Sequence, residues 1–360
     1  MKPVVCFFKN DQFIFSENYE IKQCTPRESV VEFLRSIENQ FASDLKVVQV
    51  NFEFENQALY SDQKELYSSA KASVFILKTY EIKNLSEVIL ALNPESKKFN
   101  LDFSSLVSKE NFIKKTNYVI EQIKNGRVYQ ANLTAPLQAK TSSTAAELFC
   151  QFQAKFNGSY KALLPLPHVN LLCFSPELFL HQQDGKLMTR PIKGSLRPDD
   201  DFNAHLFKNE KEDAELSMIV DLLRNDLNAL SDIHDSVVDS HREKLQLGYI
   251  QHTYSEISVN SKAPLSFVLE KTFPGGSISG CPKLESLYVI REVEPYKRQV
   301  YTGSLGWWQN NDFCLNVTIR SLIHSGDDLF YHAGCGIVYD SDPEAEWKEF
   351  LLKMGALNVK

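Results

Sequence analysis

Segments that favour strands and segments that favour helices are unevenly mixed along this chain of 360 residues. Strand-like stretches cluster within residues 235–260 and 300–339, and helix-like stretches separate the clusters irregularly. A doubly wound sheet needs regular strand–helix–strand alternation, so this order favours the α+β class. The polar stretch 93–100 is either a surface loop or a boundary. As a boundary, it separates a shortened, non-catalytic N-terminal part, residues 1–100, from a catalytic region, residues 101–360.

The charge balance and the cysteines exclude several classes of protein. The chain has 39 basic and 46 acidic residues, a net charge of −7, which argues against a broad surface for nucleic acid or anionic membranes. It lacks an apolar run of about 18 residues that would span a membrane, and its apolar start is too short for a signal peptide. The seven cysteines are scattered without a CxxC pair, so we expect reduced thiols in a cytoplasmic protein.

The segment 175–194 predicts a β-hairpin with two potentially reactive side chains at the end opposite the turn. Apolar residues lead into a tight reversal at Asp184-Gly185, and a second strand runs back. The reversal brings Glu177 and Lys193 close together. A carboxylic acid facing an amine can supply a proton donor and a nucleophile. A cross-strand ion pair on a solvated face is the alternative.

Two predicted helices each carry glutamates three residues apart, on one helix face. Glu212 and Glu215 lie in the helix predicted over 203–228, and Glu346 and Glu349 lie in the last helix. Two such pairs can form an all-oxygen cage for Mg²⁺. Solvated surface glutamates are the alternative.

Four further features are candidates for ligand contacts. The Gly-rich turn 275–280 precedes a helix and can present backbone N–H groups to an anion. Gly334-Cys335-Gly336 follows a predicted strand and can let backbone approach a ligand. Arg320 ends an apolar strand and can hold a carboxylate through two hydrogen bonds. His252 is either catalytic or structural.

Taken in order, motifs across about residues 108–360 resemble the chorismate-utilising enzyme family. The motifs are Gly126-Arg-Val-Tyr-Gln130-Ala-Asn-Leu, Ser175-Pro-Glu177, Pro191-Ile-Lys193-Gly194, Lys211-Glu-Asp-Ala-Glu215, Met218-Ile-Val-Asp-Leu-Leu-Arg-Asn-Asp226, Phe273-Pro-Gly-Gly-Ser-Ile-Ser-Gly280 and Gly336-Ile-Val with Glu344-Ala-Glu346-Trp-Lys-Glu349.

The resemblance implies an α+β fold of two packed antiparallel β-sheets flanked by helices. It implies that Mg²⁺ bridges the ring carboxylate of chorismate to Glu212, Glu215, Glu346 and Glu349. The residues implied to contact the substrate are Gln130, His252, Ser277, Tyr301, Arg320, Gly334, Cys335, Gly336 and Lys353.

Two positions distinguish branches of the family. Isochorismate and salicylate synthases resemble one another in having a Lys, which deprotonates water, where this chain has Gln130. Anthranilate synthases typically have Ala where this chain has Lys193. By resemblance, Lys193 attacks C2 while Glu177 protonates the departing C4 hydroxyl, and ammonia then attacks C4 and expels the lysine. These steps give 4-amino-4-deoxychorismate, the product of aminodeoxychorismate synthases (component I) in para-aminobenzoate and folate biosynthesis.

The resemblance also implies a source of ammonia, either solution or a separate glutamine amidotransferase subunit. Two other functions stay open at this point. One is anthranilate synthesis from the same substrate. The other is a catalytically silent homologue that binds a partner subunit.

Overall fold

Antiparallel strand pairs form the framework of the computed structural model, which describes residues 2–8, 11–94, 101–156, 158–196, 200–201, 210–230, 235–247, 250–355 and 357–359. The strands are β1 (Val4–Phe7), β2 (Gln12–Gln23), β3 (Lys46–Val50), β4 (Ala72–Asn84), β5 (Asp102–Ser105), β6 (Gln130–Lys140), β7 (Tyr160–Pro165), β8 (Asn170–Ser175), β9 (Leu178–Gln183), β10 (Lys186–Arg190), β11 (Ile192–Leu196), β12 (Val237–Leu247), β13 (Ile250–Asn260), β14 (Gly280–Cys281), β15 (Ser304–Gln309), β16 (Asp312–Val317), β17 (Ser321–Ser325), β18 (Asp328–Ile337) and β19 (Asn358–Val359). The helices are α1 (Val30–Gln40), α2 (Leu85–Leu92), α3 (Lys109–Lys124), α4 (Ala145–Phe156), α5 (Glu210–Asn228), α6 (Leu265–Thr272), α7 (Lys283–Val293) and α8 (Pro343–Lys353).

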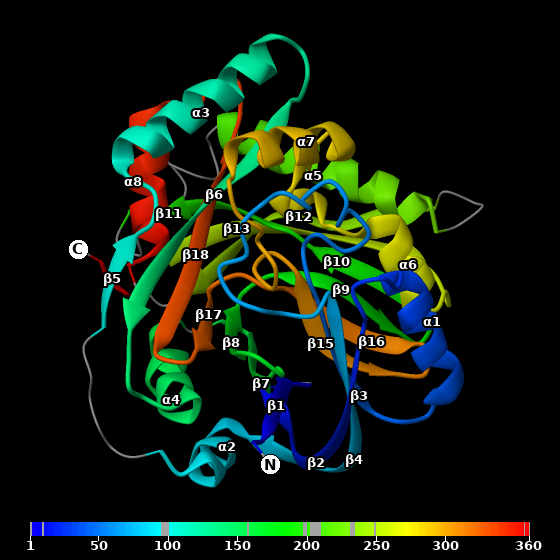
Figure 1. Ribbon diagram of the computed structural model, residues 1–360. Coiled ribbons are helices and arrows are strands. Elements are labelled where there is room, and N and C mark those ends of the chain that lie inside the picture. The colour runs from blue at the N-terminus through cyan, green and yellow to red at the C-terminus, as the bar shows by residue number, and fades with distance from the viewer. Residues whose placement is uncertain are drawn as a thin grey trace.

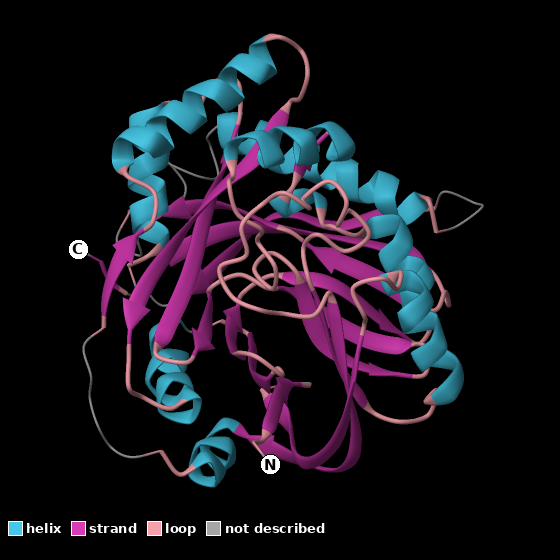
Figure 2. Ribbon diagram, in the orientation of Figure 1, coloured by secondary structure: helices cyan, strands magenta, loops and turns pink. Residues whose placement is uncertain are grey.

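The strands follow two hydrogen-bonded runs that meet at one edge. The first run passes through β4, β3, β15, β16, β9, β10 and β13, and both β11 and β12 pair with β13. The second run passes through β1, β7, β8, β17, β18 and β6, and β5 and β14 also pair with β6. Strand β2 pairs with both β1 and β4 and therefore joins the runs. The predicted α+β fold of two antiparallel sheets flanked by helices is confirmed (Figures 1 and 2).

Side chains alternate across the sheets, so neighbouring residues on β15 enter different cores. Trp307 joins a core shared by the second run and helices α3, α4 and α8. Trp308 joins a second core, in which α1, α5 and α6 pack on the first run. Helices α5 and α8 also both contact β11, the strand that carries Lys193. Glutamates on α5 and on α8 can therefore both come close to Lys193.

Strands from the first hundred residues pair with strands from much later in the chain. Strand β1 pairs with β7, and β3 pairs with β15, so the early strands belong to both runs. The stretch 93–100, a candidate boundary from the sequence, falls mostly outside the described residues.

The reversal predicted at Asp184-Gly185 is present between β9 and β10. The two residues have φ angles of 53° and 80°, both in the left-handed region, as in the tight hairpin turns whose twist matches the flanking strands. Strand β10 then pairs back along β9, with Arg190 opposite Leu178. Glu177, just before β9, and Lys193, just after β10, thus lie at the same end of the hairpin.

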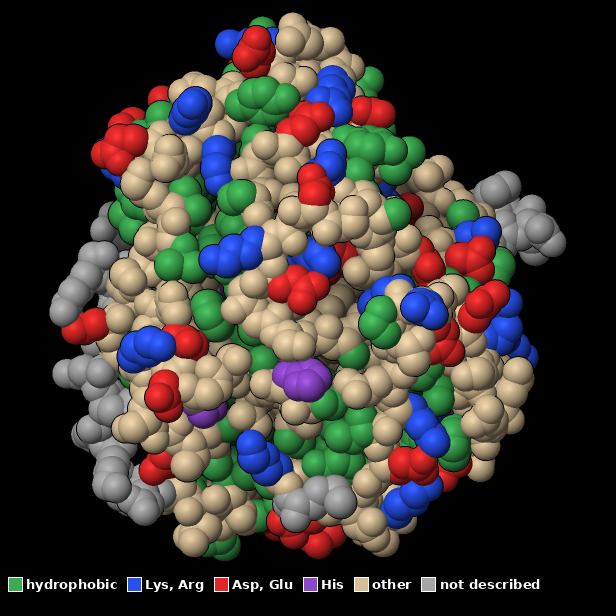
Figure 3. All heavy atoms as spheres, viewed as in Figure 1, with side chains coloured by type: hydrophobic (Ala, Val, Ile, Leu, Met, Phe, Trp, Pro, Cys, Tyr) green, Lys and Arg blue, Asp and Glu red, His purple; other side chains and the backbone are tan. Residues whose placement is uncertain are grey.

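Acidic and basic side chains are interspersed on the face shown in Figure 3, and no broad basic area covers it. This distribution agrees with the net charge of −7. Among the helices of the described ranges, none combines the length and the apolar character that crossing a membrane requires.

Candidate active site

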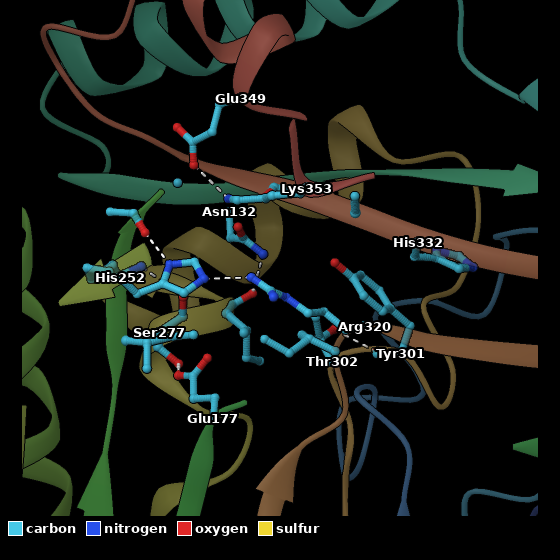
Figure 4. A pocket seen from close by; sticks show the side chains of 18 of the residues that line it. Asn132, Glu177, His252, Ser277, Tyr301, Thr302, Arg320, His332, Glu349 and Lys353 are labelled. Atoms are coloured by element: carbon cyan, nitrogen blue, oxygen red, sulfur yellow. Dashed lines mark hydrogen bonds and ion pairs between the residues drawn. The ribbon is translucent and has the colours of Figure 1, made fainter. Parts of the chain in front are cut away.

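A cavity lies where β11, β13, β18, α5 and α8 approach the Gly-rich turn at 275–280 (Figure 4). Most residues that the sequence suggested for the site line this cavity. They are Glu177, Lys193, Glu215, His252, Ser277, Tyr301, Arg320, Gly334, Gly336, Glu346, Glu349 and Lys353.

Ser277 links the proposed acid to the proposed nucleophile. Its hydroxyl donates a hydrogen bond to Oε1 of Glu177 at 2.7 Å, and its carbonyl accepts one from Nζ of Lys193 at 3.2 Å. Burial raises the pKa of Glu177 to about 7, although the hydrogen bond from Ser277 and the charge of Lys193 oppose the rise. A carboxyl group with a pKa near neutrality is well suited to donate a proton.

Lys193 also forms an ion pair with Glu215, and Gln130 joins the contact. Nζ of Lys193 lies 3.4 Å from Oε1 of Glu215, and the amide nitrogen of Gln130 donates to the same oxygen at 3.0 Å. Gly336 makes this arrangement possible. A Cβ at that position would clash with the Gln130 amide and lie 2.8 Å from Oε1 of Glu215.

Three glutamates of the cavity offer oxygen ligands suited to Mg²⁺. Glu346 and Glu349 have carboxylate oxygens within 4.8 Å of each other and of the Cys335 sulfur, and Glu215 lines the same cavity. Burial raises the pKa of Cys335 well above its ordinary value, so its thiol stays protonated and donates to the carbonyl of Glu346 at 3.4 Å. The carboxylates therefore fit Mg²⁺ and the thiol does not. Glu212 belongs to α5, but its side chain lies outside the described part of the structure.

His252 fixes the side chain of Arg320. Nδ1 of His252 contacts the carbonyl of Gly194, and Nε2 accepts a hydrogen bond from Nη2 of Arg320 at 2.6 Å. Burial, followed by the charge of Arg320, lowers the pKa of His252 well below its ordinary value, so the ring is neutral. Arg320 itself has a φ of 49°, a conformation that residues with side chains adopt rarely and that concentrates at functional sites.

Lys353 places a second fixed cation in the cavity. Its Nζ lies 2.8 Å from Oε1 of Glu349 and donates to the carbonyl of Gly334 at 2.7 Å. Burial opposes the charge, but the neighbouring Cys335 and Glu349 raise the pKa of Lys353 above its ordinary value. Together Lys353 and Arg320 give this acidic chain local positive charge where an anion would bind.

Two residues predicted to contact the substrate do not line the cavity. The side-chain amide of Gln130 already donates a hydrogen bond to Glu215, and Gln130 is only 1% exposed. The Cys335 side chain points away because Gly334 and Gly336, its neighbours on β18, face the cavity. Gly334, Cys335 and Gly336 are part of strand β18 itself, whereas the sequence suggested that they follow a strand.

Sequence reasoning missed His332, which also lines the cavity. Its ring stacks on Tyr301 with centroids 4.8 Å apart. The strand period offered a signal, since residues two apart share a face and His332 precedes Gly334 and Gly336. Asn132, Thr302 and Tyr331 are further lining residues with polar groups that the sequence did not suggest.

Residues 10–358 match the chorismate binding enzyme family. The chain belongs to this family. The resemblance read from the sequence motifs is thereby confirmed.

Two curated members of the chorismate binding enzyme family show how the relatives divide. Anthranilate synthase component 1 1 of Haloarcula marismortui is 35% identical over 265 residues, which cover 71% of this chain and 54% of that protein. Aminodeoxychorismate synthase component 1 of Escherichia coli (strain K12) is 33% identical over 268 residues, covering 71% of this chain and 58% of that protein. This chain therefore spans about half the length of the curated relatives it matches.

A solved structure shares the fold over nearly its whole length. It is that of anthranilate synthase component I from Streptococcus pneumoniae TIGR4, with a TM-score of 0.83 and 21% sequence identity. The alignment covers 97% of this chain and 93% of that one.

Proposed function

We propose that this chain acts as an aminodeoxychorismate synthase component I, which converts chorismate and ammonia into 4-amino-4-deoxychorismate. The observation that carries the proposal is the position of Lys193. Its Nζ lies in the cavity, 3.2 Å from the carbonyl of the serine whose hydroxyl donates to Glu177. The amine of Lys193 and the carboxyl group of Glu177 therefore both border the cavity, as covalent amination requires.

Chorismate is a dicarboxylate, and the cavity offers matching charge. Arg320, held by His252, is suited to bind one carboxylate through its planar guanidinium. Glu215, Glu346 and Glu349, with Glu212 from the same helix as Glu215, would hold Mg²⁺ for the other. When bound, Mg²⁺ supplies the charge that lets a carboxylate approach these glutamates. Lys353 adds a cation beside Glu349.

The chemistry follows from two successive allylic displacements. The neutral amine of Lys193 forms a bond to C2, both ring double bonds shift (C1=C2 to C1=C6 and C5=C6 to C4=C5), and the C4 hydroxyl leaves as water with the proton of Glu177. Ammonia then forms a bond to C4, both double bonds return, and the electron pair of the C2–N bond goes back to Lys193. Because burial raises the pKa of Glu177 to about 7, its proton is available near neutral pH.

Gln130 supports amination over addition of water. An amide cannot accept the proton of an attacking water molecule, and this amide already donates to Glu215 at 3.0 Å. The proposed reaction draws ammonia from solution or from a glutamine amidotransferase subunit, and its product would serve para-aminobenzoate and folate synthesis.

Anthranilate synthesis is the second candidate, because the relative from Haloarcula marismortui at 35% identity carries that name. Product identification separates the two. The protein is incubated with chorismate, Mg²⁺ and an ammonium salt, and the products are identified by mass spectrometry. We expect 4-amino-4-deoxychorismate without released pyruvate. Anthranilate or isochorismate as the main product would overturn the proposal, and a protein without turnover would be the silent homologue.

A further inference from the structure

His332 lies on β18, a strand that borders the cavity. Residues two apart on β18 share a face, so His332, Gly334 and Gly336 point the same way and all line the cavity. The two glycines leave space above the strand, and His332 supplies the one long side chain of this row. Tyr331 also borders the cavity, and its hydroxyl donates to the carbonyl of Lys353 at 3.2 Å.

The imidazole of His332 is buried, and the described part of the chain offers it no hydrogen bond. The residue is 1% exposed, and neither ring nitrogen has a hydrogen-bond partner among the described residues. Burial, followed by the charge of Arg298, lowers its pKa to about 3, so the ring is neutral. A buried polar group left unpaired destabilises a protein, so its presence in a binding cavity points to a partner supplied by the ligand.

We propose that His332 is a specificity-determining residue that hydrogen-bonds an uncharged oxygen of the bound ligand. The proposal rests on chorismate being that ligand, and the oxygen is then the ether oxygen of the enolpyruvyl group. A neutral imidazole has a donor and an acceptor but no charge to balance a carboxylate. The carboxylates have Arg320 and Lys353 for that purpose.

The position of His332 along β18 agrees with this assignment. Gly336 adjoins Glu215, at the end of the row where the ring carboxylate and Mg²⁺ are proposed to lie. Four residues of a strand extend over about 13 Å, so His332 meets the opposite end of the ligand. Tyr301, stacked on the ring at 4.8 Å, holds the imidazole plane in place.

The test compares His332→Phe with His332→Gln. The first keeps an aromatic ring on Tyr301 without polar atoms, and the second restores a donor and an acceptor. The dissociation constant of chorismate is measured by calorimetry with Mg²⁺ in a Lys193→Ala background, which prevents the proposed covalent step. His324→Phe, at a half-buried histidine on β17 outside the cavity, is the matched control.

We expect His332→Phe to weaken chorismate binding about 10-fold and His332→Gln to restore most of it, while His324→Phe changes nothing. His332→Phe should also raise the melting temperature of the free protein, because it removes an unpaired buried polar group. A residue with only a structural role would lower that temperature. If His332→Phe does not fold, His332→Leu takes its place in the comparison with Gln.

Equal affinities for the Phe and wild-type side chains would overturn the role of His332 alone. Absence of chorismate binding in the Lys193→Ala background and in wild type would overturn both this inference and the proposed function. If wild type instead binds chorismate but makes anthranilate, the proposed function fails while the comparison at His332 still stands.

Discussion

Nζ of Lys193 lies 3.4 Å from Oε1 of Glu215, so the proposed nucleophile and a proposed metal ligand form one ion pair. A protonated amine has no lone pair with which to attack, so the proposed covalent step needs the neutral amine. A cation bound among the glutamates would compete with Lys193 for Glu215. The contact therefore connects the proposed metal site to the proposed covalent step.

Removal of the metal should abolish turnover. Glutamates that converge on one cavity repel one another, and they also repel a dicarboxylate, unless a cation lies among them. We expect excess EDTA, Glu215→Gln and Glu349→Gln each to eliminate activity while circular dichroism and the melting temperature stay near those of wild type. Glu344→Gln is the matched control on α8, because Glu344 is exposed and pairs with Lys109 at 2.8 Å. Full activity in excess EDTA would disprove metal dependence.

Arg320 should control the affinity for chorismate. Nη2 of Arg320 donates to Nε2 of His252 at 2.6 Å, and this hydrogen bond fixes the orientation of the planar guanidinium. A guanidinium in a fixed orientation is suited to bind a carboxylate. Arg320→Ala should raise KM by roughly 10- to 100-fold, since hydrogen bonds to charged groups are worth about 1.5–3 kcal/mol. Arg320→Lys should recover only part of this, because an ammonium group cannot bind a carboxylate in the same bidentate way. A KM that stays unchanged in both variants would make Arg320 a structural residue.

Glu177→Gln should stabilise the free protein progressively as pH rises. The folded-state pKa of about 7 lies above the ordinary value of 4.5, so wild type loses stability between pH 4.5 and 7 as the unfolded chain ionises first. The gain of the Gln variant over wild type should grow across that window by on the order of 3 kcal/mol. Urea unfolding at pH 5 and 8.5 measures it, and the variant should meanwhile lose turnover. A stability difference independent of pH would show that Glu177 ionises normally.

Two glycine substitutions should have opposite consequences. Gly336→Ala should reduce kcat/KM strongly with little change in melting temperature, because its Cβ would displace Gln130 and Glu215. Gly326→Ala, in the β17–β18 turn, meets no atom within 4 Å but has a φ of 60°. It should cost about 1–2 kcal/mol of stability and leave kcat/KM unchanged. Equal activity in both variants would remove the argument for a positioned Gln130–Glu215 contact.

Local patterns in the sequence were sufficient for the hairpin, whereas much of the cavity followed only from the motifs taken together in their order. Asp184-Gly185 favours left-handed backbone, and both residues adopt it. The glutamate pairs follow from helical spacing, although spacing alone left solvated surface charges open until the motifs were considered together. Gly334-Cys335-Gly336 shows the limit of such patterns. These residues continue β18 because pairing with β6 outweighs the tendency of glycine to end a strand.

Contacts between distant segments could not be predicted from the sequence. His252 and Arg320 are 68 positions apart, and Gln130 and Glu215 are 85 apart, so no local period relates them. The strand period relates His332 to Gly334 and Gly336, but that signal is weak because a single histidine on an apolar strand is usually structural. Only its burial in the cavity without hydrogen-bond partners among the described residues distinguishes it.

Intact-protein mass spectrometry tests the role of Lys193 most directly. Wild-type protein is incubated with chorismate and Mg²⁺ without ammonia, and the modified residue is located by peptide mapping. We predict a mass increase of chorismate minus water on Lys193, which Glu177→Gln suppresses and Lys193→Ala abolishes. Addition of ammonium should release the adduct as 4-amino-4-deoxychorismate. An unmodified Lys193 in protein that still makes this product when ammonium is added would contradict the covalent mechanism.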